Sequence, residues 1–323
     1  MKPELYRVAH HLMSNAGIKP DHHVLVVGDS HSQPLAEIFH AAASTMAKES
    51  VLAIMAVRRN HGQEPPPIIA EAMAASDIVV HAVTYALTHT DATRYAKAKG
   101  AQIFTMRGLT EELMFRMLRI MRELDRDELL RVTNAVADRL TRAKSIHLTT
   151  DLGTDIRMDV TGRKAISLAG QGRPGHLGGS AFPGEAAIAP IEGSAIGKVV
   201  FEYSMDNLGV LDQPIHLTVK EGNVTAIEGG RSADELRLLL DQSDACATNI
   251  AEFAIGTNPV ASLAGNMAEN KKVRGAVHMA IGDNMNLDGA VRSDVHLDGM
   301  VLRPTVTIDG ETVVDRGRLM IEG

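Results

Sequence analysis

Hydrophobic residues in the first part of the chain form short continuous runs that alternate with amphipathic stretches. The runs lie at 24–27, 51–57, 77–83 and 101–106. They are apolar on both faces of a strand, and helical periodicity appears between them, as at 34–47. Strands buried on both faces and separated by helices are typical of a parallel sheet covered on both sides. We therefore predict an α/β N-terminal domain with a parallel sheet at residues 1–144.

The first apolar run ends at Gly28, and Asp29, Ser30 and His31 follow it. Ligands of a parallel sheet bind at such carboxyl ends of strands. Neither GxGxxG nor GxxxxGK[ST] is present here, so the segment lacks the glycine spacing that holds phosphates. We interpret it as a polar turn between a strand and a helix.

The pattern changes at residue 145, where short β segments replace most of the helical stretches. These segments lie at 146–149, 155–160, 198–203 and 215–220. Glu221, Gly222 and Asn223 have the composition of a hairpin turn, and a clear helical pattern returns only at 233–242. We therefore predict a mainly antiparallel α+β domain at residues 145–323.

Composition and charge exclude several classes of protein. The net charge of −7 and an aromatic content of 3% argue against a nucleic-acid-binding protein. Such a protein needs a basic surface for the phosphates or aromatic side chains that stack on the bases. No apolar run reaches the roughly 20 residues that cross a bilayer. The single cysteine, Cys246, suits a reducing compartment. We expect a cytoplasmic protein that binds neither nucleic acid nor membrane.

Candidate metal ligands lie in the apolar segments near the C-terminus. His296 and Asp298 are two residues apart in a predicted strand, so their side chains project from the same face. His278 lies in another apolar run, at 276–281. An imidazole and a carboxylate on one face are suitable ligands for a divalent metal.

Two glutamates in apolar surroundings extend this set of ligands. Glu185 begins an apolar segment and Glu252 lies inside one, and a buried carboxylate needs a cation or hydrogen-bond donors. Two imidazoles and three carboxylates suit two divalent ions that share bridging carboxylates, as in two-metal hydrolases. The same set contains two histidines and one carboxylate, which suit a single non-haem iron.

The motifs around these residues resemble the aminopeptidase T family of metallopeptidases, the thermophilic-type leucyl aminopeptidases. The resemblance is carried by Gly153–Thr154–Asp155, Pro183–Gly184–Glu185, Ala189–Pro190–Ile191–Glu192–Gly193, Ala251–Glu252–Phe253–Ala254, His278–Met279–Ala280–Ile281–Gly282 and Val295–His296–Leu297–Asp298. It covers the second domain and, more loosely, the first. It implies that two metal ions are bound by Glu185, Glu252, His278, His296 and Asp298.

The chain departs from that family at one functional position. The family has a tyrosine at the metals shortly after the HxAxG motif, whereas this chain has Asp283–Asn284–Met285–Asn286. The resemblance also extends to 2,5-dihydroxypyridine 5,6-dioxygenase, a non-haem iron enzyme. That enzyme keeps the HxD pair but has a histidine in place of Glu252, and it lacks counterparts of Glu185 and His278.

The expected function is that of a metal-dependent hydrolase of the aminopeptidase T type. It would cleave a short peptide or another small amide with two divalent ions (Zn, Co or Mn) in the second domain, with Glu192 and Asp155 as candidate proton shuttles. The resemblance implies a homodimer. One alternative is an Fe(II) ring-cleaving dioxygenase that resembles 2,5-dihydroxypyridine 5,6-dioxygenase. A second is a metal-binding scaffold without catalysis.

Overall fold

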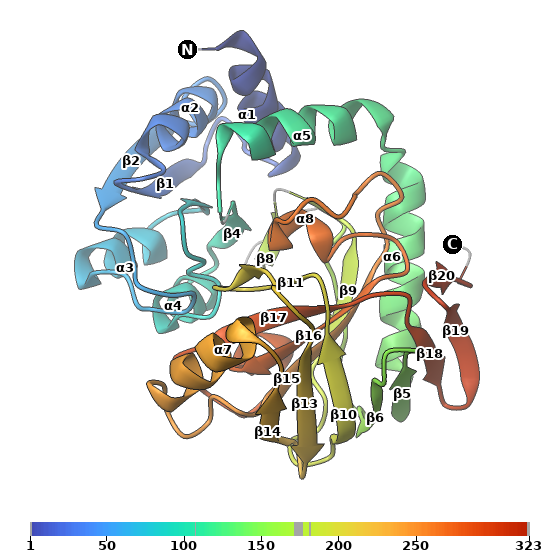
Figure 1. Ribbon diagram of the computed structural model, residues 1–323. Coiled ribbons are helices and arrows are strands. Elements are labelled where there is room, and N and C mark those ends of the chain that lie inside the picture. Colours follow the sequence, from blue (N-terminus) through green and yellow to red (C-terminus); the bar gives the residue numbers. More distant parts are fainter. Residues whose placement is uncertain (1, 107, 171–176, 181, 322–323) are drawn as a thin grey trace. The chain divides into compact units, whose positions relative to one another are not determined.

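The computed structural model describes residues 2–106, 108–170, 177–180 and 182–321 (Figure 1). The chain divides into two compact units. The first comprises Met1–Leu124 and Gly170–Pro183, and the second comprises Asp125–Ala169 and Gly184–Gly323.

The first unit is built on a five-stranded sheet in which every neighbouring pair is parallel. In spatial order the strands are β2 (Glu49–Met55), β1 (His23–Asp29), β3 (Ile78–Ala82), β4 (Gln102–Thr105) and β8 (Leu177–Ser180). The helices are α1 (Pro3–Asn15), α2 (Gln33–Ala43), α3 (Pro67–Ala74), α4 (Asp91–Ala98) and α5 (Glu111–Glu123). The predicted parallel α/β architecture is confirmed.

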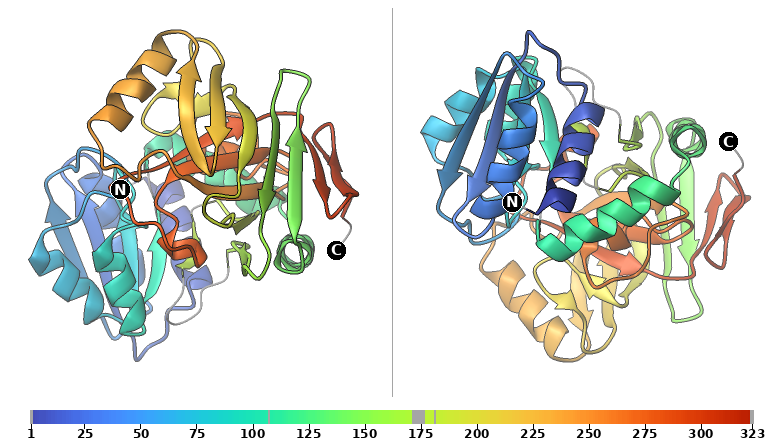
Figure 2. Two further views of the ribbon diagram at one scale, coloured as in Figure 1. Left: turned by 90° about the horizontal axis from the view of Figure 1, so that it is seen from below. Right: turned by 90° about the horizontal axis from the view of Figure 1, so that it is seen from above.

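Helices cover both faces of this sheet (Figure 2). On one face, Ile69 and Met73 of α3 join Leu25, Val27 and Val79 of the strands in one core. On the other face α2 packs on β1 and β2, and α1 packs on α2 and α5. The central strands β1 and β3 are almost wholly buried, as their continuous apolar runs predict, whereas the edge strand β2 is partly exposed.

The second unit contains two antiparallel sheets. The eight-stranded sheet has the order β14 (Asn223–Glu228), β13 (Ile215–Lys220), β10 (Ile196–Phe201), β6 (Asp155–Asp159), β5 (Ser145–Thr149), β18 (Thr305–Ile308), β19 (Glu311–Asp315) and β20 (Arg318–Leu319). The seven-stranded sheet has the order β12 (Gly209–Val210), β11 (Ser204–Met205), β17 (His296–Val301), β16 (Val277–Gly282), β15 (Ile250–Gly256), β9 (Glu185–Ile188) and β7 (Ile166–Ser167). The helical elements are α6 (Arg126–Thr141), α7 (Arg231–Asp241), α8 (Met267–Asn270) and the 3₁₀ turn η1 (Met285–Leu287). The predicted antiparallel α+β architecture is confirmed.

One hydrophobic core joins the two sheets of the second unit. It contains Phe201 of the eight-stranded sheet, Phe253 and Met279 of the seven-stranded sheet, and Leu236 of α7. The inner face of the seven-stranded sheet is therefore apolar, and its opposite face is available for other side chains.

The division of the chain differs from the expected boundary at residue 145. Helix α6 belongs to the second unit because Val132, Val136 and Leu140 are buried in its core, and the helix packs on β9 and β7. Asp125 separates α6 from α5, since its carboxylate accepts hydrogen bonds from the backbone N–H groups of Asp127 and Glu128. The chain returns to the first unit later, where β8 extends the parallel sheet beside β4.

The turn after β1 is held by the carboxylate of Asp29. This carboxylate accepts hydrogen bonds from the backbone N–H of Thr84 at 2.6 Å and from the Thr84 hydroxyl at 3.0 Å. It also accepts the backbone N–H groups of His31 and Ser32. Asp29 thus joins the ends of β1 and β3, where the strand order reverses and where a ligand would otherwise be expected.

Replacing Asp29 by asparagine should destabilise the protein. Burial raises the pKa of Asp29, but hydrogen bonds from Thr84 and Ser32 outweigh burial and hold it below its ordinary value. A lowered folded-state pKa contributes stability above the unfolded-state pKa of about 4, and this contribution is lost as the pH falls through the folded-state pKa. We expect Asp29→Asn to lower the free energy of unfolding by about 1–3 kcal/mol at pH 7, and less below about pH 4.

Urea unfolding followed by circular dichroism measures this difference. The exposed Asp21 provides the matched control, and Asp21→Asn should stay within about 0.5 kcal/mol of the wild type. Equal effects of the two substitutions would show that Asp29 does not stabilise the turn.

Candidate metal centre

Neighbouring strands of the seven-stranded sheet bring the predicted ligands together. Ala280 of β16 lies opposite Glu252 on one side and Asp298 on the other, so these three residues form a row across the sheet. The small side chain of Ala280 leaves space between the two carboxylates. His278 and His296 lie two residues from Ala280 and Asp298 in their own strands, and they therefore share the same face.

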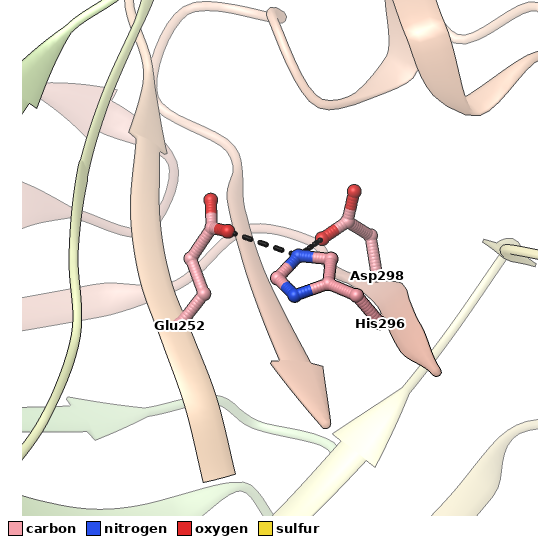
Figure 3. A group of neighbouring side chains, drawn as sticks. All are labelled: Glu252, His296 and Asp298. Atoms are coloured by element: carbon pink, nitrogen blue, oxygen red, sulfur yellow. Dashed lines mark ion pairs between the residues drawn. The ribbon is translucent and has the colours of Figure 1, made fainter. Parts of the chain in front are cut away.

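Glu252, His296 and Asp298 form the tightest group (Figure 3). His296 Nε2 lies 3.1 Å from Glu252 Oε2 and 3.3 Å from Asp298 Oδ1. One potential ligand atom of each residue lies within 4.8 Å of the other two. Ligand atoms about 2.0–2.2 Å from one ion are separated by at most about 4.4 Å, so small side-chain rotations bring all three into range. The group fits a single divalent ion.

His278 and Glu185 lie directly beside this group. His278 Nε2 is 3.0 Å from Glu252 Oε1, 4.0 Å from Asp298 Oδ1 and 3.7 Å from Glu185 Oε2. All five predicted ligands are buried, with side chains at most 7% exposed. Among the described residues, Glu185 Oε2 and His278 Nδ1 have no hydrogen-bond partner. The structure thus assembles the whole predicted set in one buried cluster.

Burial and close partners shift the pKa values of the cluster in opposite directions. Burial raises the pKa of Glu252, but hydrogen bonds with His278 and His296 outweigh it and hold the pKa well below its ordinary value. Burial also raises the pKa of Asp298, and Lys271 and His296 reverse this effect. Burial lowers the pKa of His296, whereas its hydrogen bonds with Asp298 and Glu252 raise it to about 10.

Backbone groups fix the orientation of the HxD pair. His296 Nδ1 donates a hydrogen bond to the carbonyl of Asp283 at 2.7 Å, which leaves Nε2 directed at the two carboxylates. The backbone N–H of Asp298 donates to Asp206 Oδ2 at 3.2 Å, and the backbone N–H of Asp206 donates to the carbonyl of Asp298 at 2.8 Å. This kind of support is typical of metal ligands.

Two lysines also contact the cluster, and no sequence pattern indicates their presence there. Lys271 Nζ lies 3.0 Å from Asp298 Oδ2 and 3.7 Å from Glu185 Oε1. Lys272 is fully buried and forms an ion pair with Glu185. Adjacent lysines in a polar segment are typical of an exposed loop, so no local pattern predicts their burial.

The two candidate proton shuttles have other partners. The carboxylate of Glu192 forms an ion pair with Arg163 and accepts hydrogen bonds from Asn284 Nδ2 at 2.9 Å and from the backbone N–H of Ala290 at 2.8 Å. Asp155 is exposed at the start of β6 and lies 2.8 Å from His147 Nε2. Glu192 therefore supports the loop between β16 and β17. The proton-transfer role of both residues stays a prediction.

The fold places a buried set of ligands that form a candidate metal site. The chain belongs to the 2,5-dihydroxypyridine 5,6-dioxygenase (NicX) family, whose model matches residues 4–321. The dioxygenase is the alternative function predicted from the sequence. The family match supports this alternative better than it supports the expected hydrolase. No curated protein matches the chain.

Several solved structures share the fold. The chain is similar to 2,5-dihydroxypyridine dioxygenase from Pseudomonas putida KT2440, with 20% identity, a TM-score of 0.80, and coverage of 98% of this chain and 96% of that chain. It is also similar to wild-type AmpT from Thermus thermophilus, with 16% identity, a TM-score of 0.72, and coverage of 99% and 100%. In the part of the chain that the structure describes, no helix is long and apolar enough to cross a membrane.

Loss of either HxD ligand should weaken metal binding. His296→Ala removes a nitrogen ligand, and Asp298→Asn removes a negative charge that offsets the charge of the cation. Since loss of outer-shell support alone costs about 10–100-fold in affinity, we expect each change to raise the Kd for Mn²⁺ at least about 100-fold. Isothermal titration calorimetry measures this Kd.

The matched control is the exposed His147–Asp155 pair of the eight-stranded sheet. His147→Ala and Asp155→Asn should leave the Kd for Mn²⁺ unchanged. Unaltered Mn²⁺ binding in a His296→Ala/Asp298→Asn double variant would place the metal elsewhere.

Metal binding should release a proton from His296. With a pKa of about 10, this ring is protonated at pH 7 in the metal-free protein and must lose its proton before it binds a metal. The association constant for Mn²⁺ should therefore rise about tenfold per pH unit between about pH 6 and pH 9. Calorimetry in two buffers with different ionisation enthalpies counts the released protons, and a pH-independent affinity would contradict this assignment.

Proposed function

We propose that the protein is a ring-cleaving dioxygenase that uses one Fe(II) ion and acts on a small hydroxylated aromatic substrate. The observation that carries this proposal is the group of Glu252, His296 and Asp298, in a chain of the 2,5-dihydroxypyridine 5,6-dioxygenase family. Three protein ligands leave coordination positions open for other molecules, although this group has one histidine and two carboxylates where non-haem iron sites commonly have two histidines and one carboxylate.

The residues present fit such an ion. Glu252 and Asp298 bring two negative charges that balance a divalent cation, and His296 adds one nitrogen ligand. Bound Fe(II) would supply one-electron chemistry with dioxygen and a position for substrate oxygens. The glutamate at position 252 is a difference from the histidine that the resemblance assigns to the dioxygenase, and it makes the ligand set more acidic.

The remaining side chains position the ligands. The carbonyl of Asp283 holds the His296 ring, and Asp206 holds the backbone of Asp298. His278 Nε2 donates a hydrogen bond to Glu252 Oε1 at 3.0 Å and thereby orients this carboxylate. Burial of these groups keeps bulk water away from the reacting atoms.

A two-metal hydrolase is the second candidate. It is favoured by Glu185 and His278, which lie beside the three-residue group as the resemblance to aminopeptidase T implies. In that case the carboxylates would bridge two ions, and the substrate would be an amide.

Oxygen consumption distinguishes the two functions. We expect protein prepared without oxygen and loaded with Fe(II) to consume dioxygen together with 2,5-dihydroxypyridine or a related hydroxylated aromatic compound. Asp298→Asn should reduce the rate at least about 100-fold because it weakens the site that holds the iron. Lys220→Met, at an exposed position in β13, should leave the rate unchanged.

Parallel assays with aminoacyl amides use the protein loaded with Zn²⁺, Co²⁺ or Mn²⁺. Amide cleavage without oxygen uptake would replace the dioxygenase by the hydrolase. Tight metal binding without either activity would support the non-catalytic scaffold.

A further inference from the structure

The segment at and after α8 carries two lysines into the metal centre. Lys272 is fully buried and pairs with Glu185, while Lys271, with 14% of its side chain exposed, contacts Asp298 and Glu185. Both ammonium groups therefore lie at carboxylates that a second metal ion would use as ligands.

A network of buried polar groups fixes this segment in place. The buried carboxylate of Glu269 accepts hydrogen bonds from the backbone N–H of Ser262 at 2.9 Å and from its hydroxyl at 3.1 Å. Asn270 Oδ1 accepts the backbone N–H of Ala264 at 2.8 Å, and Asn270 Nδ2 donates to Ser204 Oγ at 2.8 Å. These residues immediately precede the lysines, so the network sets their position.

The backbone of Lys272 is held from both sides. Its N–H donates to the carbonyl of Glu269 at 2.8 Å, and its carbonyl accepts the N–H of Asn258 at 2.9 Å. A lysine loses much side-chain entropy on burial. Because the backbone of Lys272 is already fixed by these hydrogen bonds, only the side chain has to be ordered. The fold therefore holds the ammonium group of Lys272 at a defined position in the cluster.

The two lysines occupy the carboxylate that a second ion would need. Lys272 forms an ion pair with Glu185 Oε1, and Lys271 Nζ lies 3.7 Å from the same oxygen and 3.0 Å from Asp298 Oδ2. A second divalent ion at Glu185 would lie against both ammonium groups in a buried site, where repulsion between like charges is strongly unfavourable.

We propose that Lys271 and Lys272 take the place of a second metal ion, so that the centre binds one divalent ion and Glu185 serves as a lysine partner. This inference rests on the metal centre of the proposed function. It assigns Glu252, His296 and Asp298 to the ion and gives Glu185 a different role.

Metal stoichiometry tests the proposal with Mn²⁺ alone. The protein is dialysed to equilibrium against excess Mn²⁺, and bound manganese per chain is measured by mass spectrometry and by electron paramagnetic resonance. We expect one ion with a mononuclear spectrum in the wild type. We expect two ions with an exchange-coupled spectrum in Lys271→Met/Lys272→Met, because methionine keeps the side-chain length and removes the charge.

The matched control is Lys198→Met/Lys220→Met, at two exposed positions of the eight-stranded sheet, which should bind one ion. Two ions in the wild type, or one ion in Lys271→Met/Lys272→Met, would overturn the proposal. If that variant does not fold without metal, Mn²⁺ during refolding should recover it, and failure of Mn²⁺ to do so would also overturn the proposal.

The outcomes also separate this inference from the proposed function. No bound Mn²⁺ in the wild type would remove the metal centre and both proposals with it. One bound ion in a protein that does not consume oxygen after loading with Fe(II) would remove the dioxygenase and support the role of the lysines.

Discussion

Three carboxylates buried side by side impose the strongest physical constraint on this protein. Glu185, Glu252 and Asp298 are each at most 5% exposed, and their mutual repulsion in this buried region must be compensated by positive charge. Lys271, Lys272 and the protonated ring of His296 supply that charge from two separate places in the sequence. The second unit has to bring these places together, and its topology does so.

Antiparallel pairing is what makes the arrangement possible. Strands β9, β15, β16 and β17 are neighbours, and their register sets Glu252, Ala280 and Asp298 in one row. Because side chains alternate along a strand, the residues between the ligands, such as Phe253 and Leu297, enter the apolar core. The same strands therefore provide the hydrophobic core on one face and the polar cluster on the other.

The sequence predicted the features that depend on local pattern. Continuous apolar runs identified the parallel sheet, and the i, i+2 spacing placed His296 and Asp298 on one face. The grouping of all five candidate ligands followed from their apolar surroundings and from the family resemblance. Features that depend on distant partners could not be predicted. One is the ion pair of Glu192 with Arg163 and its hydrogen bond from Asn284. Another is the packing of α6 in the core of the second unit.

The lysines show why such a cluster is harder to predict than its ligands. A histidine or glutamate in an apolar strand is conspicuous, whereas Lys271 and Lys272 lie in a polar stretch whose burial depends on Glu269 and Asn270. Nothing in the local sequence distinguishes them from lysines on the surface.

One fold can hold different reactions if the balance of charge at the same strands is altered. The chain shares its fold with a dioxygenase and with AmpT, although it is only 20% and 16% identical to them, so the fold alone does not choose the chemistry. In this chain, Lys271 and Lys272 supply positive charge at the carboxylate of Glu185. A metal ion can polarise a substrate and exchange its ligands, whereas a lysine at the same position neutralises a carboxylate without opening a coordination position. On the proposed assignment, the cation beside Glu185 determines whether the cluster has one reactive metal or two, while the strands that carry it stay the same.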